Sequence, residues 1–298
     1  MILAVGEVLM ELRRADSDGV LATPGEWAGP FSSGAPAIFA SVAARVGARA
    51  GLVGAVGDDA LGRHLFTRLQ RDGVDTQALK FAPTRATALA MVAYDSAGGR
   101  DFYYSVRGSA AEAIDPATAE RAARAATWIH VSGSSIGFGD PLASIVEATV
   151  AAALEAGARL SVDPNLRPDA HPETRARTAA LARSASVVFP SAGELDALAL
   201  TSAELVGLGA LVCMTDGPQG VELLEPGAAS PVKVSAPAVA ELDATGAGDS
   251  FAAAFVAALL SGATPERAAR AACAVAAHSV TVLGAMEADV ERYVPVPT

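Results

Sequence analysis

Short aliphatic runs alternate along this chain with longer, alanine-rich stretches whose apolar residues recur at helical spacing. Such alternation predicts a mainly parallel sheet sandwiched by helices, because each parallel strand needs a crossover, usually helical, to reach the next. We therefore expect an α/β fold. The expected strands are Ile2–Val5, Gly51–Val56, Trp128–Val131, Arg159–Val162, Val187–Phe189 and Ala210–Met214, and the expected helices are Pro36–Val46, Ala60–Arg71, Pro116–Ala125, Pro141–Ala156, Pro172–Ser184, Ser250–Leu260 and Pro265–Val282.

Two segments interrupt this alternation. Leu9–Gly34 has no clear helical period, and Thr87–Val106 is expected to form two strands around a turn at Asp95–Gly99. Together they predict a small β-sheet that stands off the main sheet, inserted from about 9–34 and 87–107. Because the chain shows no internal repeat, low-complexity linker or block of charge, we expect residues 1–298 to form one domain.

The composition restricts the class of partner. The chain has 22 basic and 33 acidic side chains, a formal net charge of −11, which disfavours nucleic acid and anionic membrane surfaces. No apolar run is long enough for a membrane span, and the first residues lack the features of a signal peptide. The two cysteines, Cys213 and Cys273, lie in apolar surroundings, which suits a reducing compartment. We expect a cytoplasmic protein that acts on a small molecule.

The segment 243–251 reads Asp-Ala-Thr-Gly-Ala-Gly-Asp-Ser-Phe and runs directly into an apolar helix. Small residues at Gly246, Ala247 and Gly248 let the backbone turn sharply, so that N–H groups at a helix N-terminus can face an anion. A carboxylate in the same turn, Asp249, can take a proton from a hydroxyl beside that anion. Phosphoryl transfer to an alcohol requires this pairing. The alternative is that Asp249 only caps the helix.

Other functional classes lack their motifs. The chain contains no Gly-x-x-x-x-Gly-Lys-Ser/Thr, which excludes a P-loop NTPase, and no Gly-x-Gly-x-x-Gly follows the first strand, which leaves a dinucleotide oxidoreductase little support. The four histidines do not show metal-ligand spacing. A non-catalytic protein that binds a sugar or nucleotide on the same fold is the remaining alternative, although pure binding needs no base.

The segment 243–251 resembles the C-terminal signature of the ribokinase-like (PfkB) family of carbohydrate kinases. Similar motifs follow in family order over nearly the whole chain. They are Gly6-Glu7 with Glu11, Ser33-Gly34-Ala35-Pro36-Ala37, Gly54-x-x-Gly57-Asp58-Asp59-x-x-Gly62, Asp163-Pro164-Asn165-Leu166-Arg167, Ser191-Ala192-Gly193-Glu194, Thr215-Asp216-Gly217-Pro218-Gln219-Gly220 and Gly284-Ala285. The chain departs from the family where Ser191 replaces the usual Asn, Ile38 replaces a frequent polar Asn and Met214 occupies an often basic position.

The resemblance implies an ATP-dependent sugar kinase that uses Mg²⁺, with a monovalent cation such as K⁺ as a further candidate cofactor. It implies that Asp249 deprotonates the sugar hydroxyl while Gly246, Ala247 and Gly248 stabilise the transferring phosphoryl group. The nucleotide is expected at Ser191, Glu194, Thr215, Gly217 and Gly220, with Glu194 acting on Mg²⁺ indirectly. The resemblance also implies that the segments at about 9–34 and 87–107 form a lid that covers the sugar. Relatives often dimerise through this lid, so a homodimer is expected.

The sugar is expected to contact Glu11, Gly34, Ala35, Tyr104, Arg107 and Arg167. Arg167 follows a predicted strand at the edge where open α/β sheets bind ligands, and its guanidinium suits a carboxylate or a keto oxygen. The segment 102–111 resembles 2-keto-3-deoxygluconate kinases and fructokinases, with the arginine register shifted by about one residue at Arg107. The expected substrate is 2-keto-3-deoxygluconate or a ketohexose, phosphorylated on a primary hydroxyl.

Overall fold

The computed structural model describes residues 1–16, 20–94, 99–167 and 169–293. Its main sheet has the strand order β13-β12-β11-β10-β9-β8-β1-β4-β5, and all pairs are parallel except the two that involve β12. The strands are β1 Ile2–Val5, β4 Ala50–Gly57, β5 Leu79–Ala82, β8 Trp128–Ser132, β9 Arg159–Asp163, β10 Val187–Val188, β11 Leu211–Thr215, β12 Val221–Leu224 and β13 Val232–Val234. All six strands that the sequence predicts are confirmed.

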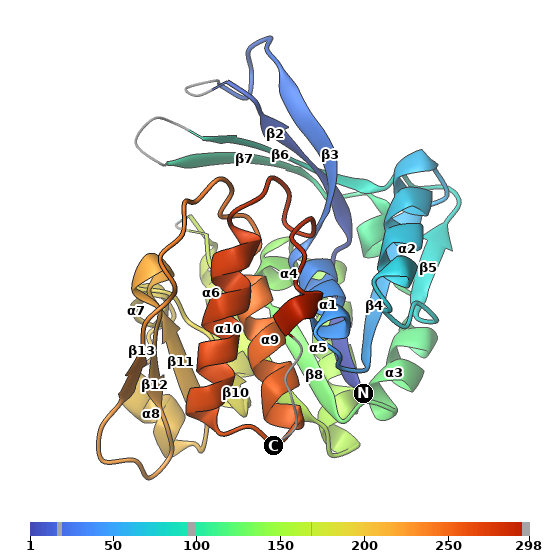
Figure 1. Ribbon diagram of the computed structural model, residues 1–298. Helices are drawn as coiled ribbons and strands as arrows, with labels where there is room; N and C mark the ends of the chain where they lie inside the picture. Colours follow the sequence, from blue (N-terminus) through green and yellow to red (C-terminus); the bar gives the residue numbers. More distant parts are fainter. Residues whose placement is uncertain (17–19, 95–98, 168, 294–298) are drawn as a thin grey trace.

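Helices cover both faces of this sheet, as the alternation predicts (Figure 1). One face packs against α1 Ala35–Arg45, α2 Ala60–Arg71, α9 Ala247–Leu260 and α10 Pro265–Ser279, and the other against α3 Pro116–Arg124, α5 Leu142–Glu155 and α6 Pro172–Arg183. The sequence predicts these seven helices with ends that shift by at most three residues. The short helices α4 Gly133–Gly137, α7 Glu194–Ala197 and α8 Ser202–Gly207 were not predicted. No helix within the described ranges is long and apolar enough to cross a membrane.

The lid is a separate sheet with the strand order β3-β2-β6-β7, which stands over one end of the main sheet in Figure 1. Its strands are β2 Leu9–Arg14, β3 Trp27–Ser33, β6 Ala88–Tyr94 and β7 Arg100–Ser105. The central pair, β2 with β6, is parallel, and the two outer pairs are antiparallel. Both segments that interrupt the alternation therefore form strands as predicted, although residues 95–98 of the expected turn lie outside the described part.

The lid has one face toward the main sheet and one toward solvent. Because side chains alternate along a strand, Leu9 and Glu11 on β2 share a face with Phe102 and Tyr104 on β7, and all four line one cavity. Tyr103, which points the other way, is 57% exposed. This alternation decides which lid residues can reach a bound ligand.

Candidate active site

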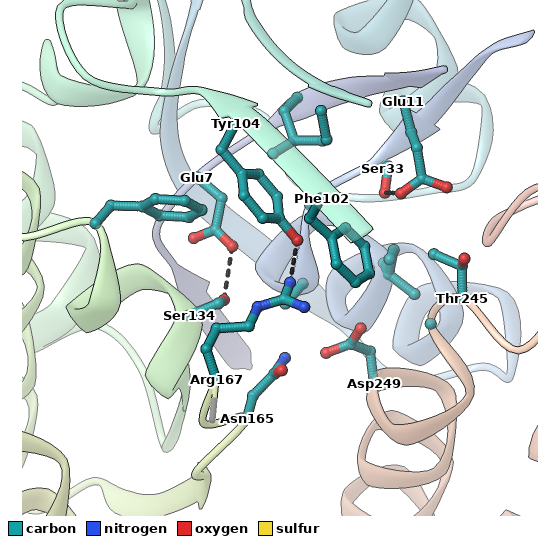
Figure 2. A pocket seen from close by; sticks show the side chains of 17 residues that line it. Glu7, Glu11, Ser33, Phe102, Tyr104, Ser134, Asn165, Arg167, Thr245 and Asp249 are labelled. Atoms are coloured by element: carbon teal, nitrogen blue, oxygen red, sulfur yellow. Dashed lines mark hydrogen bonds between the residues drawn. The ribbon is translucent and has the colours of Figure 1, made fainter. Parts of the chain in front are cut away.

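A cavity of about 130 Å³ lies between the lid and the carboxyl ends of β1, β8 and β9. Figure 2 shows its side chains, which converge from both sheets and from the start of α9. The residues that line it are Glu7, Leu9, Glu11, Ser33, Gly34, Ala35, Ile38, Ala90, Phe102, Tyr104, Ser134, Phe138, Asn165, Arg167, Thr245, Gly246 and Asp249. Ligands bind at this edge in open α/β sheets, so the cavity is the candidate active site.

The first turn of α9 borders the cavity with an open N-terminus. Gly246 precedes the helix with φ at +75°, a left-handed conformation that glycine adopts without strain. No side chain among the described residues caps the helix, so N–H groups of its first turn are left for a ligand. A Cβ on Gly246 would lie 2.8 Å from the Cβ of Ala285 and 3.1 Å from Cδ1 of Ile38. The loop therefore has no room for a side chain here, and its geometry suits an anion.

Asp249 lies in the first turn of α9 and is 7% exposed. Its Oδ1 atom is buried and has no hydrogen-bond partner in the described part of the chain. Burial, together with the negative charge of Glu7, raises the pKa of Asp249 to about 8, although Arg167 opposes the shift. Because its side chain does not cap the helix, the alternative capping role has no support. A buried carboxylate with a raised pKa and an unused oxygen is suited to accept a proton.

Arg167 and Tyr104 meet on the opposite wall of the cavity. Nη2 of Arg167 donates a hydrogen bond to the Tyr104 hydroxyl, and the guanidinium carbon lies 4.1 Å from the ring centroid of Phe102. In Figure 2 the guanidinium points into the same space as the Asp249 carboxylate. Burial raises the pKa of Tyr104, so this phenol remains a neutral donor or acceptor. The three side chains form a polar and aromatic wall suited to a sugar.

Two further carboxyl groups face the cavity from the first strand and the lid. Glu7, just after β1, accepts hydrogen bonds from the hydroxyls of Ser134 and Ser135, and burial raises its pKa. Glu11 accepts from Ser33 Oγ at 3.3 Å, while its Oε1 is buried with no partner among the residues described. Burial and the nearby Asp243 raise the pKa of Glu11 to about 7. These groups offer a neutral sugar several hydrogen bonds.

The structure brings most of the predicted sugar residues together. Glu11, Gly34, Ala35, Tyr104 and Arg167 line the cavity with Gly246 and Asp249. Gly34 has φ at +104°, and a Cβ there would lie 2.7 Å from the carbonyl oxygen of Glu7. Arg107 lies beyond the end of β7, is exposed and does not line the cavity, so the structure does not join it to the others.

Several cavity residues were missing from the predicted set. Glu7, Ser134 and Asn165 each lie one residue past the residue that follows a buried strand, at the edge where Arg167 was expected. A search for every polar residue just beyond a predicted strand could have found them. Asp59 illustrates the opposite case, because it caps α2 through Gly62 N at 2.8 Å and bonds the Thr87 hydroxyl at 2.7 Å. The motif at 54–62 thus has a structural role through Asp59.

The predicted nucleotide residues gather beside the cavity, at the ends of β10 and β11. Ser191 Oγ lies 3.1 Å from Thr215 Oγ1, and Glu194 accepts hydrogen bonds from the backbone of Ser191 and Leu166 at 2.7 and 2.6 Å. Gly217 lies with Asp216 in the exposed loop after β11, and Gly220, at the end of this loop, is buried. None of these residues lines the cavity. The predicted nucleotide residues and the cavity therefore lie next to each other along one edge of the sheet.

Asp163 and Glu194 lie near each other beside the predicted nucleotide residues. These two carboxylates suit a metal ion whose other ligands are not protein side chains. Asp163 is buried, and burial together with Glu194 and Asp249 raises its pKa well above the ordinary value. Within the described ranges no group of three or more His, Cys, Asp or Glu side chains could hold a metal ion. Such a site fits Mg²⁺, which usually keeps waters and binds one or two carboxylates plus phosphate oxygens.

Comparisons with known proteins agree with this geometry. A family model described as "pfkB family carbohydrate kinase" matches residues 1–292. The fructokinase of Salmonella typhimurium is 30% identical over 275 residues, which are 89% of this chain and 86% of that protein. A putative ribokinase II from E. coli, solved with ATP and Mg²⁺, superimposes with a TM-score of 0.89 at 31% identity and covers 98% of both chains. A fructokinase double mutant from Vibrio cholerae O395, solved with fructose, ADP and potassium, gives a TM-score of 0.81 at 27% identity over 98% of this chain and 97% of that one.

Proposed function

Because this chain belongs to the pfkB family of carbohydrate kinases, we propose that it transfers a phosphoryl group from ATP to a primary hydroxyl of a ketohexose. The observation that carries this proposal is the position of Asp249. Its unpartnered, buried carboxyl oxygen lies at the uncapped N-terminus of α9, inside a cavity that a lid covers. A base next to an anion-binding helix end is the arrangement that transfer to an alcohol requires.

In this proposal the residues of the chain bind, orient and deprotonate the sugar. Arg167, Tyr104 and Glu11 hold its oxygens, so that one hydroxyl lies beside Asp249. The Asp249 carboxylate takes the hydroxyl proton as the oxygen forms a bond to phosphorus, and the bond between phosphorus and the ADP oxygen breaks. N–H groups of the turn 246–248 stabilise the charge on the transferring phosphoryl group. The lid excludes water from the cavity.

ATP is the phosphoryl donor in this proposal, and Mg²⁺ bound to it supplies charge neutralisation. The loops that hold Ser191, Thr215, Gly217 and Gly220 would bind the nucleotide next to the sugar. Glu194 uses both carboxyl oxygens on backbone N–H groups, so it would reach the metal through water. Potassium in the Vibrio cholerae relative makes a monovalent cation a candidate cofactor for this chain as well.

The charge of the cavity favours a ketohexose over a sugar acid. Among the residues that the structure describes, three carboxyl groups, Glu7, Glu11 and Asp249, line the cavity with one guanidinium, that of Arg167. Arg167 is already bonded to Tyr104 and lies near Asp249. The carboxylate of 2-keto-3-deoxygluconate would add a negative charge to a site that already disfavours ionisation of its own acids. A neutral ketose avoids this cost, and the fructokinase relatives agree.

The test is the release of ADP by the purified protein with ATP and Mg²⁺, in potassium buffer, across fructose, tagatose, 2-keto-3-deoxygluconate, ribose and adenosine. We expect kcat/KM for a ketohexose to exceed that for 2-keto-3-deoxygluconate by about tenfold or more, because the carboxyl groups of the cavity would repel the carboxylate of the acid. A preference for the acid would contradict the charge argument. ATP binding without turnover of any sugar would favour the non-catalytic alternative.

We also propose that two chains associate through the outer face of the lid. Leu12 and Met91 lie on that face and are only partly buried, and strand edges and apolar lid faces are suited to pairing. We expect sedimentation velocity to give the mass of a dimer at micromolar concentration and Met91→Glu to shift it toward the monomer. A wild-type protein that sediments as a monomer throughout would contradict this proposal.

A further inference from the structure

A second set of contacts joins the lid to residues 243–246, the segment before α9 to which the proposed function assigns phosphate binding (the phosphate-binding loop). It centres on Asp243, whose side chain is 1% exposed and which opens the segment that leads to Gly246. Its two oxygens accept hydrogen bonds from Thr245 N at 3.1 Å and Gly284 N at 3.0 Å. Asp243 therefore fixes the loop before α9 and the segment near residue 284 at the same time.

The lid supplies two more partners to the same carboxylate. The Tyr94 hydroxyl donates to Asp243 Oδ1 at 3.2 Å and lies 3.0 Å from Thr245 Oγ1, while Arg13 Nη1 is 3.4 Å from Asp243 Oδ2. Arg13 also donates to the carbonyl of Leu242 at 2.9 Å, and its guanidinium carbon lies 4.4 Å from the Tyr94 ring centroid. The two lid side chains thus act as one stacked unit on the loop.

The strand register places this unit on the inner face of the lid. Arg13 pairs with Val92, and Glu11 pairs with Ala90. Glu11 and Ala90 line the cavity. Since alternate residues share a face, Arg13 and Tyr94 continue the cavity face toward the far end of β2 and β6. They meet the loop that ends in Thr245 and Gly246, which themselves line the cavity.

A neighbouring contact shows that the lid fits closely against this region. Gly284, whose N–H binds Asp243, is in left-handed conformation beneath the ring of Phe31 on β3. A Cβ on Gly284 would lie 2.6 Å from Cδ1 of Phe31. The backbone near Gly284 therefore packs directly on the lid, and a change in the position of the lid would have to move Phe31 or the segment near residue 284.

We propose that Arg13, Tyr94 and Asp243 form a latch, which holds the lid on the phosphate-binding loop while the phosphoryl group is transferred. Arg13 and Tyr94 are then positioning residues, which act through Asp243 on Thr245 and Gly246. This inference rests on the proposed kinase function for its catalytic consequence. With the latch open, water can reach the cavity and accept the phosphoryl group in place of the sugar, which yields ADP and inorganic phosphate.

The test compares Tyr94→Phe with Tyr103→Phe. Both remove one hydroxyl from the lid, but only Tyr94 bonds the loop, whereas Tyr103 is on the outer face and mostly exposed. For Tyr94→Phe we expect the KM for the ketohexose to rise about tenfold, the effect of one lost hydrogen bond to a charged group. The KM for ATP should stay within about twofold. The ADP formed per sugar phosphate should rise above one, and Tyr103→Phe should match the wild type.

A second measurement does not depend on the substrate. The amides of Thr245 and Gly284 both donate to Asp243, so their hydrogen exchange, followed by NMR, reports on the latch in the free protein. We expect exchange of both to accelerate about tenfold in Tyr94→Phe and not in Tyr103→Phe. Equal exchange in the two variants would overturn the latch. If the wild type phosphorylates no ketohexose, the proposed substrate fails, and the exchange comparison still decides the latch.

Discussion

Replacement of Asp249 by Asn should lower kcat of the ketohexose reaction by at least about a hundredfold, the lower range for loss of a general base. The amide keeps the shape of the side chain but cannot take the hydroxyl proton. Asp249 lines the cavity with Arg167, whereas the predicted nucleotide residues do not line it, so the KM for ATP should change little. Steady-state kinetics with ATP and Mg²⁺ would measure both. A variant as active as the wild type would remove Asp249 from the mechanism.

The pH dependence supplies an independent readout of the same assignment. The pKa of Asp249 in the folded protein is about 8, against an ordinary value of 3.8. The carboxylate is the active form, so kcat/KM of the wild type should rise with pH up to about 8 and then level off. The residual activity of Asp249→Asn should lack this rise. A wild-type profile that is flat from pH 6 to 9 would contradict the base assignment.

The same shift separates a catalytic defect from a folding defect. A carboxyl group whose pKa is raised by folding stabilises the protein fully below its unfolded pKa, near pH 4, and this contribution is lost as the pH rises through 8. Asn has no such titration. The Tm of Asp249→Asn should therefore exceed that of the wild type increasingly between about pH 4 and pH 8. An inactive variant with an unchanged or higher Tm has lost chemistry and not structure.

The sequence predicted the helices and strands whose buried apolar residues recur at regular spacing. Long helices and the central strands, such as β4 and β8, carry strong periodic signals and were found within a few residues. The two edge strands, β5 and β13, and the neighbouring β12 were missed because they are short and carry exposed or half-exposed charges such as Lys80, Glu222 and Lys233. Strands of this kind owe their conformation to a neighbouring strand more than to their own composition.

The candidate site shows the same division between local and long-range information. Asp249 and Gly246 belong to one continuous motif, so their joint role could be read from adjacent residues. Arg13 and Asp243 are far apart in the chain, since Arg13 contacts Leu242 at a separation of 229 positions. A local sequence pattern could therefore not join them. Arg107 was expected in the site because the segment 102–111 resembles 2-keto-3-deoxygluconate kinases and fructokinases, but it lies beyond the end of β7, is exposed and does not line the cavity. Side-chain direction depends on register, which only the folded lid reveals.

Replacement of Gly246 by Ala should lower kcat/KM by about a hundredfold, comparable to the loss of one donor from an anion-stabilising site. Gly246 has φ at +75°, and an added Cβ would lie 2.8 Å from Ala285 and 3.1 Å from Ile38, which would displace the turn and its N–H groups. Gly262→Ala is the matched control, because Gly262 follows the other end of the same helix with φ at +93° and has open space around a new Cβ.

Both alanine variants share the backbone cost of a left-handed residue, about 1 kcal/mol, so both should lower Tm by a few degrees. Only Gly246→Ala should also lose activity, since only its loop meets the cavity. Thermal unfolding and steady-state kinetics on the two proteins would separate these effects. Equal activity in the two variants would mean that the turn before α9 does not hold the phosphoryl group, and the anion would then have to bind elsewhere along the sheet edge.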